Sequence, residues 1–178
     1  GLQLVDTPMS PLAALHLAGL LTRNGEQQAA EKLIDLRLNA NFNRTTIAAL
    51  LALEAQNGPP SLRTNIVRGI IDFSLLAQGR SEQQTLASRL QLARFLDPDS
   101  DVAHLLLAQQ QIKSANYRDA INNLSTIASD GPLGQPAMIA LSDIANENQQ
   151  FSKAASILQQ AIAINPEDGY LYKLLGDS

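Results

Sequence analysis

Two stretches decide the fold: residues 117–132 read YRDAINNLSTIASDGP, and residues 151–166 read FSKAASILQQAIAINP. Each begins with an aromatic residue, has Ala three positions and Leu seven positions later, and ends in Pro. Matching positions lie 34 residues apart. A period shared by turn residues and apolar residues predicts one structural unit repeated along the chain. Further residues share this interval: Pro98, Pro132 and Pro166; Leu107, Leu141 and Leu175.

Apolar residues recur at helical spacing along nearly the whole chain, and no segment shows the sustained alternation of a strand. The connections are short, so consecutive helices should form antiparallel hairpins. The sequence therefore predicts an all-α protein. We expect about ten helices, over residues 11–23, 26–39, 44–56, 61–78, 81–95, 100–114, 117–129, 135–147, 151–164 and 168–177.

The strongest break in the chain is the segment Asn57 to Pro60, which reads NGPP. Before it, the pair Leu17-Ala18 fits a repeat that is out of phase with the later ones, and the helix over 44–56 is one too many for a regular array. We therefore expect irregular repeat-like helices over 1–58 and a regular array over 59–178, with Asn57 to Pro60 as a kink or subdomain boundary.

The repeat pattern resembles the tetratricopeptide repeat family, in a bacterial style. In that family, an apolar residue and a small one share the first helix, an aromatic residue opens the second, a small residue follows and Pro closes the unit. The matching residues here are Leu107-Ala108, Leu141-Ser142 and Leu175-Gly176; Tyr117 and Phe151; Ala120 and Ala154; and Pro98, Pro132 and Pro166. The match is strong from Asp101 to Ser178 and weaker over 67–98, where Phe73-Ser74 stands at the anchor pair but Leu86 replaces the small residue.

This resemblance implies antiparallel helix hairpins stacked into a right-handed α-solenoid, with each unit touching only its neighbours. The repeats would span about 67–100, 101–134 and 135–168, with a partial one at 169–178, so we expect the natural protein to continue beyond Ser178. Ala120 and Ala154 should lie where helices cross closely. Tyr117 and Phe151 should fill the gap between units, and truncation of a fully buried Phe151 would cost about 3–5 kcal/mol.

Composition excludes several classes of function. The net charge is -4, which argues against nucleic-acid binding. There is no cysteine, so disulfides, thiolate metal sites and cysteine nucleophiles are excluded. The longest apolar run, over residues 47–53, is too short to span a bilayer, so we expect no membrane insertion. The compartment stays open, because cytoplasmic and periplasmic proteins can both lack cysteine.

No pattern of catalytic, cofactor-binding or metal-binding residues stands out, so we expect a protein that is not an enzyme and carries no cofactor. The acidic segment from Asp97 to Asp101 resembles the start of a calcium loop, but the required Gly and Glu are replaced by Val102 and Ala108. It fits an inter-repeat turn better. The two histidines, His16 and His104, lack a local ligand pattern, and His104 should be a partly buried structural residue.

The family usually binds ligands in a concave groove lined by the first helices of successive repeats. Mapped onto this chain, the candidate groove residues are Leu105, Gln109, Lys113, Ile139, Asp143, Asn146 and Lys173. Some family members use Lys and Asn there to grip a chaperone's terminal carboxylate. Only Lys173 matches that pattern, so we expect no such clamp.

The leading hypothesis is a scaffold that holds a protein or peptide through the groove or an edge of the solenoid. Two alternatives stay open. The chain could be a structural module that self-associates into homo-oligomers, or the regulatory or docking arm of a larger enzyme.

Overall fold

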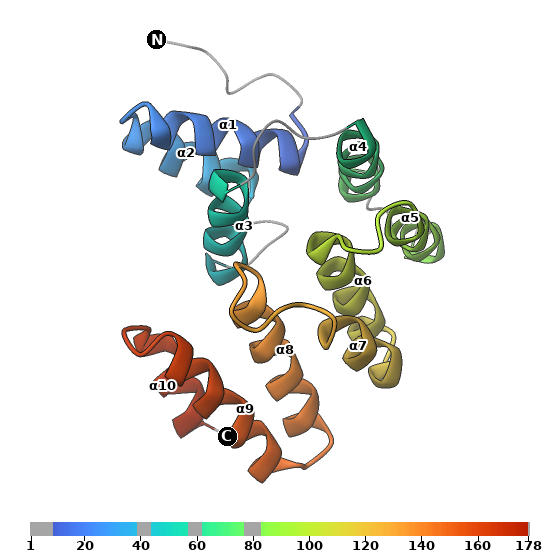
Figure 1. Ribbon diagram of the computed structural model, residues 1–178, viewed down its shortest axis with the longest axis vertical. Helices are drawn as coiled ribbons and strands as arrows, with labels where there is room; N and C mark the ends of the chain where they lie inside the picture. Colours follow the sequence, from blue (N-terminus) through green and yellow to red (C-terminus); the bar gives the residue numbers. More distant parts are fainter. Residues whose placement is uncertain (1–8, 39–43, 57–61, 77–82, 178) are drawn as a thin grey trace. The chain divides into compact units, whose positions relative to one another are not determined.

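The computed structural model describes residues 9–38, 44–56, 62–76 and 83–177. These residues form ten α-helices and no strand, which confirms the all-α prediction (Figure 1). The helices are α1 (Pro11–Arg23), α2 (Gln27–Arg37), α3 (Arg44–Gln56), α4 (Leu62–Leu76), α5 (Gln83–Leu96), α6 (Asp101–Lys113), α7 (Tyr117–Leu124), α8 (Gly134–Glu147), α9 (Phe151–Ile164) and α10 (Gly169–Gly176).

The chain divides into two compact units, Gly1–Pro98 and Asp99–Ser178. The sequence led us to expect a boundary near residue 58, whereas the division seen in the structure comes after Pro98. The expected kink from Asn57 to Pro60 lies outside the described residues and stays a prediction. Within the two units, most neighbouring helices pair as hairpins: α1 with α2, α4 with α5, α6 with α7, and α8 with α9.

Unit 1 is organised around α1, which contacts α2, α3 and α4. Helix α3 also packs on α1. The start of α1 is held by two side chains. Ser10 caps the helix by accepting from the Ala13 amide, and the Asp72 carboxylate on α4 accepts from the Leu12 amide at 2.8 Å. Two distant segments are thereby joined at a helix N-terminus, where anionic groups are favourable.

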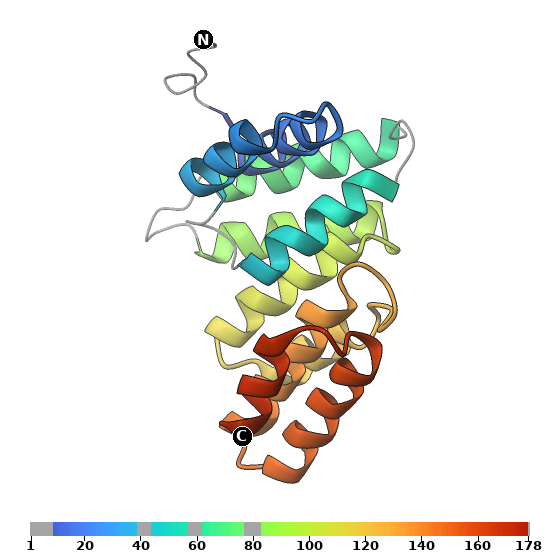
Figure 2. The same ribbon diagram turned by 90° about the vertical axis from the view of Figure 1, so that its left-hand side faces the viewer.

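Unit 2 contains the hairpins α6–α7 and α8–α9, and α10 packs against α9 (Figures 1 and 2). Its apolar core includes Met138, Leu158 and Leu171, one from each of the last three helices. A polar contact supports this stacking, because the Gln135 side chain at the start of α8 donates to the Asp168 carboxylate. The same carboxylate caps α10 by accepting from the Tyr170 amide.

Three hairpins turn with the same backbone geometry. The residue after each first helix's C-cap has positive φ, and two amides donate back into the last turn of the helix, as in a Schellman motif. The left-handed residues are Gly25 (φ 80°), Ala115 (φ 56°) and Gln149 (φ 59°). The closing bonds run from Glu26 to Leu21, Asn116 to Gln111 and Gln150 to Ala145. Ala115 and Gln149 are one repeat apart, so the period extends to backbone conformation.

Helix α7 is shorter than predicted, because it ends at Leu124 rather than near residue 129. Thr126, just after the helix, competes with it through its hydroxyl, because Thr126 Oγ1 donates to the Asn123 carbonyl at 2.7 Å. One repeat later, the positions that match Ser125 and Thr126 hold Gln159 and Gln160, which favour a helix, and α9 continues to Ile164. Local side-chain chemistry therefore shortens the second helix of one repeat relative to that of the next.

The small residues of the repeat lie in the core as expected, since Ala120 and Ala154 are both 0% exposed. The aromatic residues do not behave alike. Tyr117 is half-buried, but Phe151 is 57% exposed, so the expectation that Phe151 fills the gap between successive repeats is wrong. Helix α10 packs against the later part of α9, around Leu158 and Ala161, whereas residues 151–153 at the start of α9 are exposed. Truncating Phe151 should cost far less than a buried aromatic would.

Candidate functional site

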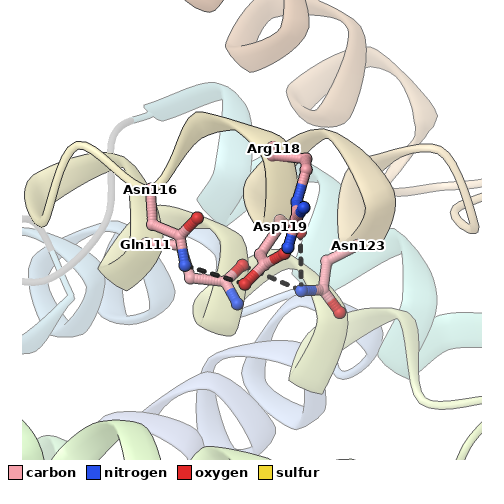
Figure 3. Close-up of polar contacts among 5 residues, drawn as sticks. All are labelled: Gln111, Asn116, Arg118, Asp119 and Asn123. Carbon is pink, nitrogen blue, oxygen red and sulfur yellow. Dashed lines mark hydrogen bonds and ion pairs between the residues drawn. The ribbon is translucent and has the colours of Figure 1, made fainter.

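A buried polar cluster connects α6 and α7. His104 lies in the core with its Nδ1 atom 3.0 Å from Asn123 Oδ1. The amide nitrogen of Asn123 donates to Gln111 Oε1 at 2.8 Å and to the Asp119 carbonyl at 3.0 Å (Figure 3). Because that nitrogen faces two acceptors, Oδ1 faces the ring, and the His104 Nδ1 atom carries the proton that it donates.

The cluster continues to the surface at the start of α7. Asn116 donates to the Asp119 carboxylate at 2.8 Å, and Arg118 forms a 3.5 Å ion pair with the same carboxylate (Figure 3). The Arg118 side chain is 89% exposed, so this pair contributes little to stability. The arrangement fixes the α6–α7 turn and presents no nucleophile, which agrees with the structural role expected for His104.

The next repeat replaces this polar pair with apolar residues. Met138 is the counterpart of His104 and Ile157 that of Asn123. Met138 belongs to the core of unit 2, and Ile157 packs against the same core. The fold therefore accepts either a hydrogen-bonded pair or an apolar pair at this helix crossing, provided that both members match.

Two of the seven candidate groove residues cannot contact a ligand as expected. Leu105 is 2% exposed and Ile139 is 9% exposed, so neither offers an apolar surface. The family mapping assigns these positions to a groove, but in this chain they are core positions. Replacing them with Glu would test stability rather than binding.

The other five candidates reach the surface to different extents. Gln109 and Asn146 are half-buried, and Lys113, Asp143 and Lys173 are exposed. They come from α6, α8 and α10, the first helices of successive repeats. Neither lysine forms an ion pair with a described residue.

Two residues on α8 have unusual surroundings. The Oδ1 atom of Asn146 is buried and has no hydrogen-bond partner among the described residues. Nearby on the same helix, partial loss of its water shell raises the pKa of Asp143, and the Glu147 carboxylate one turn later raises it further. An unpaired buried acceptor costs about 1–3 kcal/mol, so α8 carries a polar group whose bonding is incomplete.

A mainly apolar cleft of about 260 Å³ opens between α7, α8 and α9, within unit 2. Its polar lining comprises one cation, Lys153, with two amides and a hydroxyl. Nothing in the repeat pattern indicated this cleft, because its lining residues come from α7, α8 and α9 and from the ends and turns beside them. The lining residues are Ile121, Ser125, Leu141, Ile144, Ala145, Asn148, Gln150, Lys153 and Ile157.

The acidic segment after α5 acts as a turn and helix start. Ser100 caps α6 by accepting from the Ala103 amide at 3.4 Å. Burial raises the pKa of Asp101, while the electrostatic influence of nearby His104 lowers it. Across the described residues, no group of three or more potential metal-ligating side chains comes together. No helix in the described ranges has the length and apolar character needed to cross a membrane.

Comparison with known proteins identifies no family. No known protein family matches the chain, and no curated protein matches it. Among solved structures, the chain is similar to one described as "MamA RS-1 ArsTM double mutant". The TM-score is 0.47 and the identity 15%, over 92% of this chain and 80% of that chain. At this level of similarity, we base the function on the chain's own residues.

Proposed function

We propose that this chain is a non-catalytic scaffold that holds a protein or peptide on the face formed by α6, α8 and α10. The observation that carries the proposal is the unpaired, buried Oδ1 atom of Asn146 on α8. The Asn146 side chain as a whole is half-buried, so a rotation of its amide would bring this oxygen to the surface. There, a backbone N–H of a bound peptide would supply the missing donor and recover the cost of leaving the acceptor unpaired.

The charges on the same helices suit a peptide. Lys113 and Lys173 are exposed cations without an ion pair among the described residues, and Asp143 is an exposed carboxylate between them in the chain. These groups can meet charged side chains of a partner at the rim, where charges mainly guide association and register. The two buried positions, Leu105 and Ile139, would support the face from below.

A non-catalytic role is favoured by the placement of the only two residues suited to proton transfer near neutral pH. His104 is buried and engaged with Asn123, out of reach of a substrate. His16 lies on exposed surface in unit 1 and takes part in an interaction within the chain. Neither histidine lines the cleft of unit 2.

Selection from a phage-displayed library of random peptides would test the proposal. Enriched peptides, made synthetically, should bind the chain measurably, and the double variant Lys113→Glu, Asn146→Ala should weaken that binding at least about tenfold, or about 1.4 kcal/mol. Arg118→Glu is the matched control, because Arg118 is exposed on α7, which is not one of the helices of the proposed face. Failure to enrich peptides, or equal peptide affinity of the parent and the double variant, would refute the proposed binding face.

A further inference from the structure

The cleft of unit 2 has a chemistry that specifies its occupant. Its floor is apolar, with Leu141, Ile144 and Ile157 among its members, and its single cation, Lys153, has no ion-pair partner among the described residues. The volume, about 260 Å³, lies just below the range of about 300–1,000 Å³ for small-molecule sites. One large apolar side chain with a carboxylate nearby would fit this site better than a cofactor.

Unit 1 presents a feature of the opposite kind. Four large apolar side chains are exposed at one end of the α4–α5 hairpin, where Arg63 donates to the Leu96 carbonyl and joins the start of α4 to the end of α5. We call these four residues the apolar end. They are Leu62 (78% exposed), Ile66 (50%), Leu92 (49%) and Phe95 (79%). Single exposed apolar residues are normal, but several together indicate an interaction surface.

Carboxylates follow the apolar end in the chain. Asp97 and Asp99 come two and four residues after Phe95, and neither has an ion pair among the described residues. The neighbouring cation, Arg94, is already engaged in an interaction within the chain. The apolar end therefore places an exposed ring close in the chain to carboxylates that form no ion pair with a described residue, and the cleft offers an apolar floor and a cation to match them.

We propose that the cleft is a self-association site that receives Phe95 from a second copy of this chain, with Asp97 of that copy meeting Lys153. The ring would cover the apolar floor, and the ion pair would set its direction at the rim. This surface differs from the α6–α8–α10 face, so the inference stands apart from the proposed function.

The contact joins two different surfaces, so it is heterologous: each copy donates one apolar end and offers one cleft. Such contacts build closed rings where the rotation between copies closes, and open chains where it does not. One ring and one ion pair make a small interface, and small interfaces are typically weak and transient. We therefore expect association that depends strongly on protein concentration.

Sedimentation equilibrium of the whole chain would test the inference, from about 10 μM to about 1 mM, the range of weak association. The average mass of the parent should rise above the 19.1 kDa of one chain as concentration increases. Phe95→Ser and Lys153→Glu should each remain at 19.1 kDa. Both positions are exposed, so circular dichroism should show an unchanged fold. Leu36→Ser and Lys32→Glu are matched controls that should associate like the parent, since neither residue belongs to the two surfaces or to the proposed peptide-binding face.

Mixing the two variants provides the decisive result. Phe95→Ser keeps a working cleft and Lys153→Glu keeps a working apolar end, so the equimolar mixture should form a one-to-one pair and nothing larger. A parent that stays at one chain's mass throughout, a Phe95→Ser variant that associates like the parent, or a mixture that stays monomeric would each overturn the inference. The peptide-binding face would be unaffected by any of these outcomes.

Discussion

Ala115 and Gln149 hold a backbone conformation that L-residues with a side chain rarely adopt. Both close a hairpin with positive φ, and the third turn of the same kind uses Gly25. A residue with a Cβ costs roughly 1–2 kcal/mol in the left-handed conformation. Glycine avoids this cost, but it gives up part of the gain because it loses more backbone entropy on folding. Two of the three turns therefore keep a small, local strain that their hydrogen bonds outweigh.

Gln149→Gly should stabilise the protein by about 1 kcal/mol, because it removes the left-handed strain at an exposed position. Urea denaturation followed by circular dichroism would measure the change. Gly25→Ala is the reciprocal control and should lose a similar amount of stability. The left-handed backbone would be the only source of strain, because no atom crowds a Cβ at that position. An unstable Gln149→Gly variant would show that the side chain makes a contact that matters more than the strain.

The buried pair of His104 and Asn123 allows a second experiment at this scale. Asn123→Ile alone leaves the ring without its acceptor and should cost about 1–3 kcal/mol. The double variant His104→Met, Asn123→Ile copies the next repeat and should regain most of that loss. A double-mutant cycle from urea denaturation gives the coupling energy. Additive losses in the cycle would mean that the two sites are not energetically coupled.

Individual helices show how much the sequence could foretell. The bounds of α1, α3 and α9 match the prediction, because their ends depend on local signals such as Ser10-Pro11 at the start of α1. Helix α7 was predicted too long, since Ile127 and Ala128 continue the helical spacing and Ile127 still reaches the core. Periodicity indicates which residues are buried, whereas the end of the helix depends on local competition from the Thr126 hydroxyl, which donates to the Asn123 carbonyl.

The candidate site could be predicted only in part. Sequence comparison within the repeat identified the first helices as a possible binding face, but it could not show that Leu105 and Ile139 are covered. The cleft was not foreseen, because its existence depends on how three helices meet. The unpaired oxygen of Asn146 is likewise a property of packing, since an Asn at a half-buried position usually finds a partner.

The start of α8 depends on a close approach between backbones. A Cβ added at Gly134 would lie 2.1 Å from the Ser129 carbonyl oxygen, so the turn could not keep its shape. Gly134→Ala should destabilise the chain by about 1–3 kcal/mol, the typical cost of overpacking. Gly169→Ala at the start of α10 is the control, because a Cβ there meets nothing within 4 Å. Thermal unfolding would compare the two, and equal melting temperatures would contradict the steric account.

At the scale of the whole molecule, the division after Pro98 was hidden by the repeat. Pro98 and Pro132 occupy matching positions, yet the chain changes unit only after Pro98. Unit 1 contains the extra helix α3 and its own link between α1 and α4, which gives it internal contacts that a regular array lacks. A comparison of residues at matching repeat positions treats each position separately, so it does not detect such contacts between helices.

Carboxylates that lose part of their water shell on folding give stability a dependence on pH. Burial raises the pKa of Asp72 above its ordinary 3.8, against the lowering effects of the Leu12 amide, the Ser10 hydroxyl and the Arg68 charge. The pKa values of Asp101 and Asp143 are raised as well. A raised pKa means that the folded state binds protons more tightly, so these groups favour folding at low pH and lose that contribution as pH rises through the folded pKa.

Asp72→Asn should therefore gain stability relative to the parent as pH increases from about 4 to 7, because Asn retains an acceptor for the Leu12 amide without the buried charge. The measurement is the difference in melting temperature between parent and variant at several pH values. If the difference stayed constant with pH, or reversed, the carboxylate would be better accommodated in its charged form than its surroundings indicate.

The early end of α7 has a consequence for local opening. A helix of 8 residues followed by an irregular segment offers little cooperative protection. Amide hydrogens from Ser125 to Asp130 should exchange with deuterium well before those in the middle of α8 and α9. The buried side chains of Ile127, within this segment, and of Leu133, just after it, attach it to the core. The shortest second helix would then be where solvent first enters unit 2.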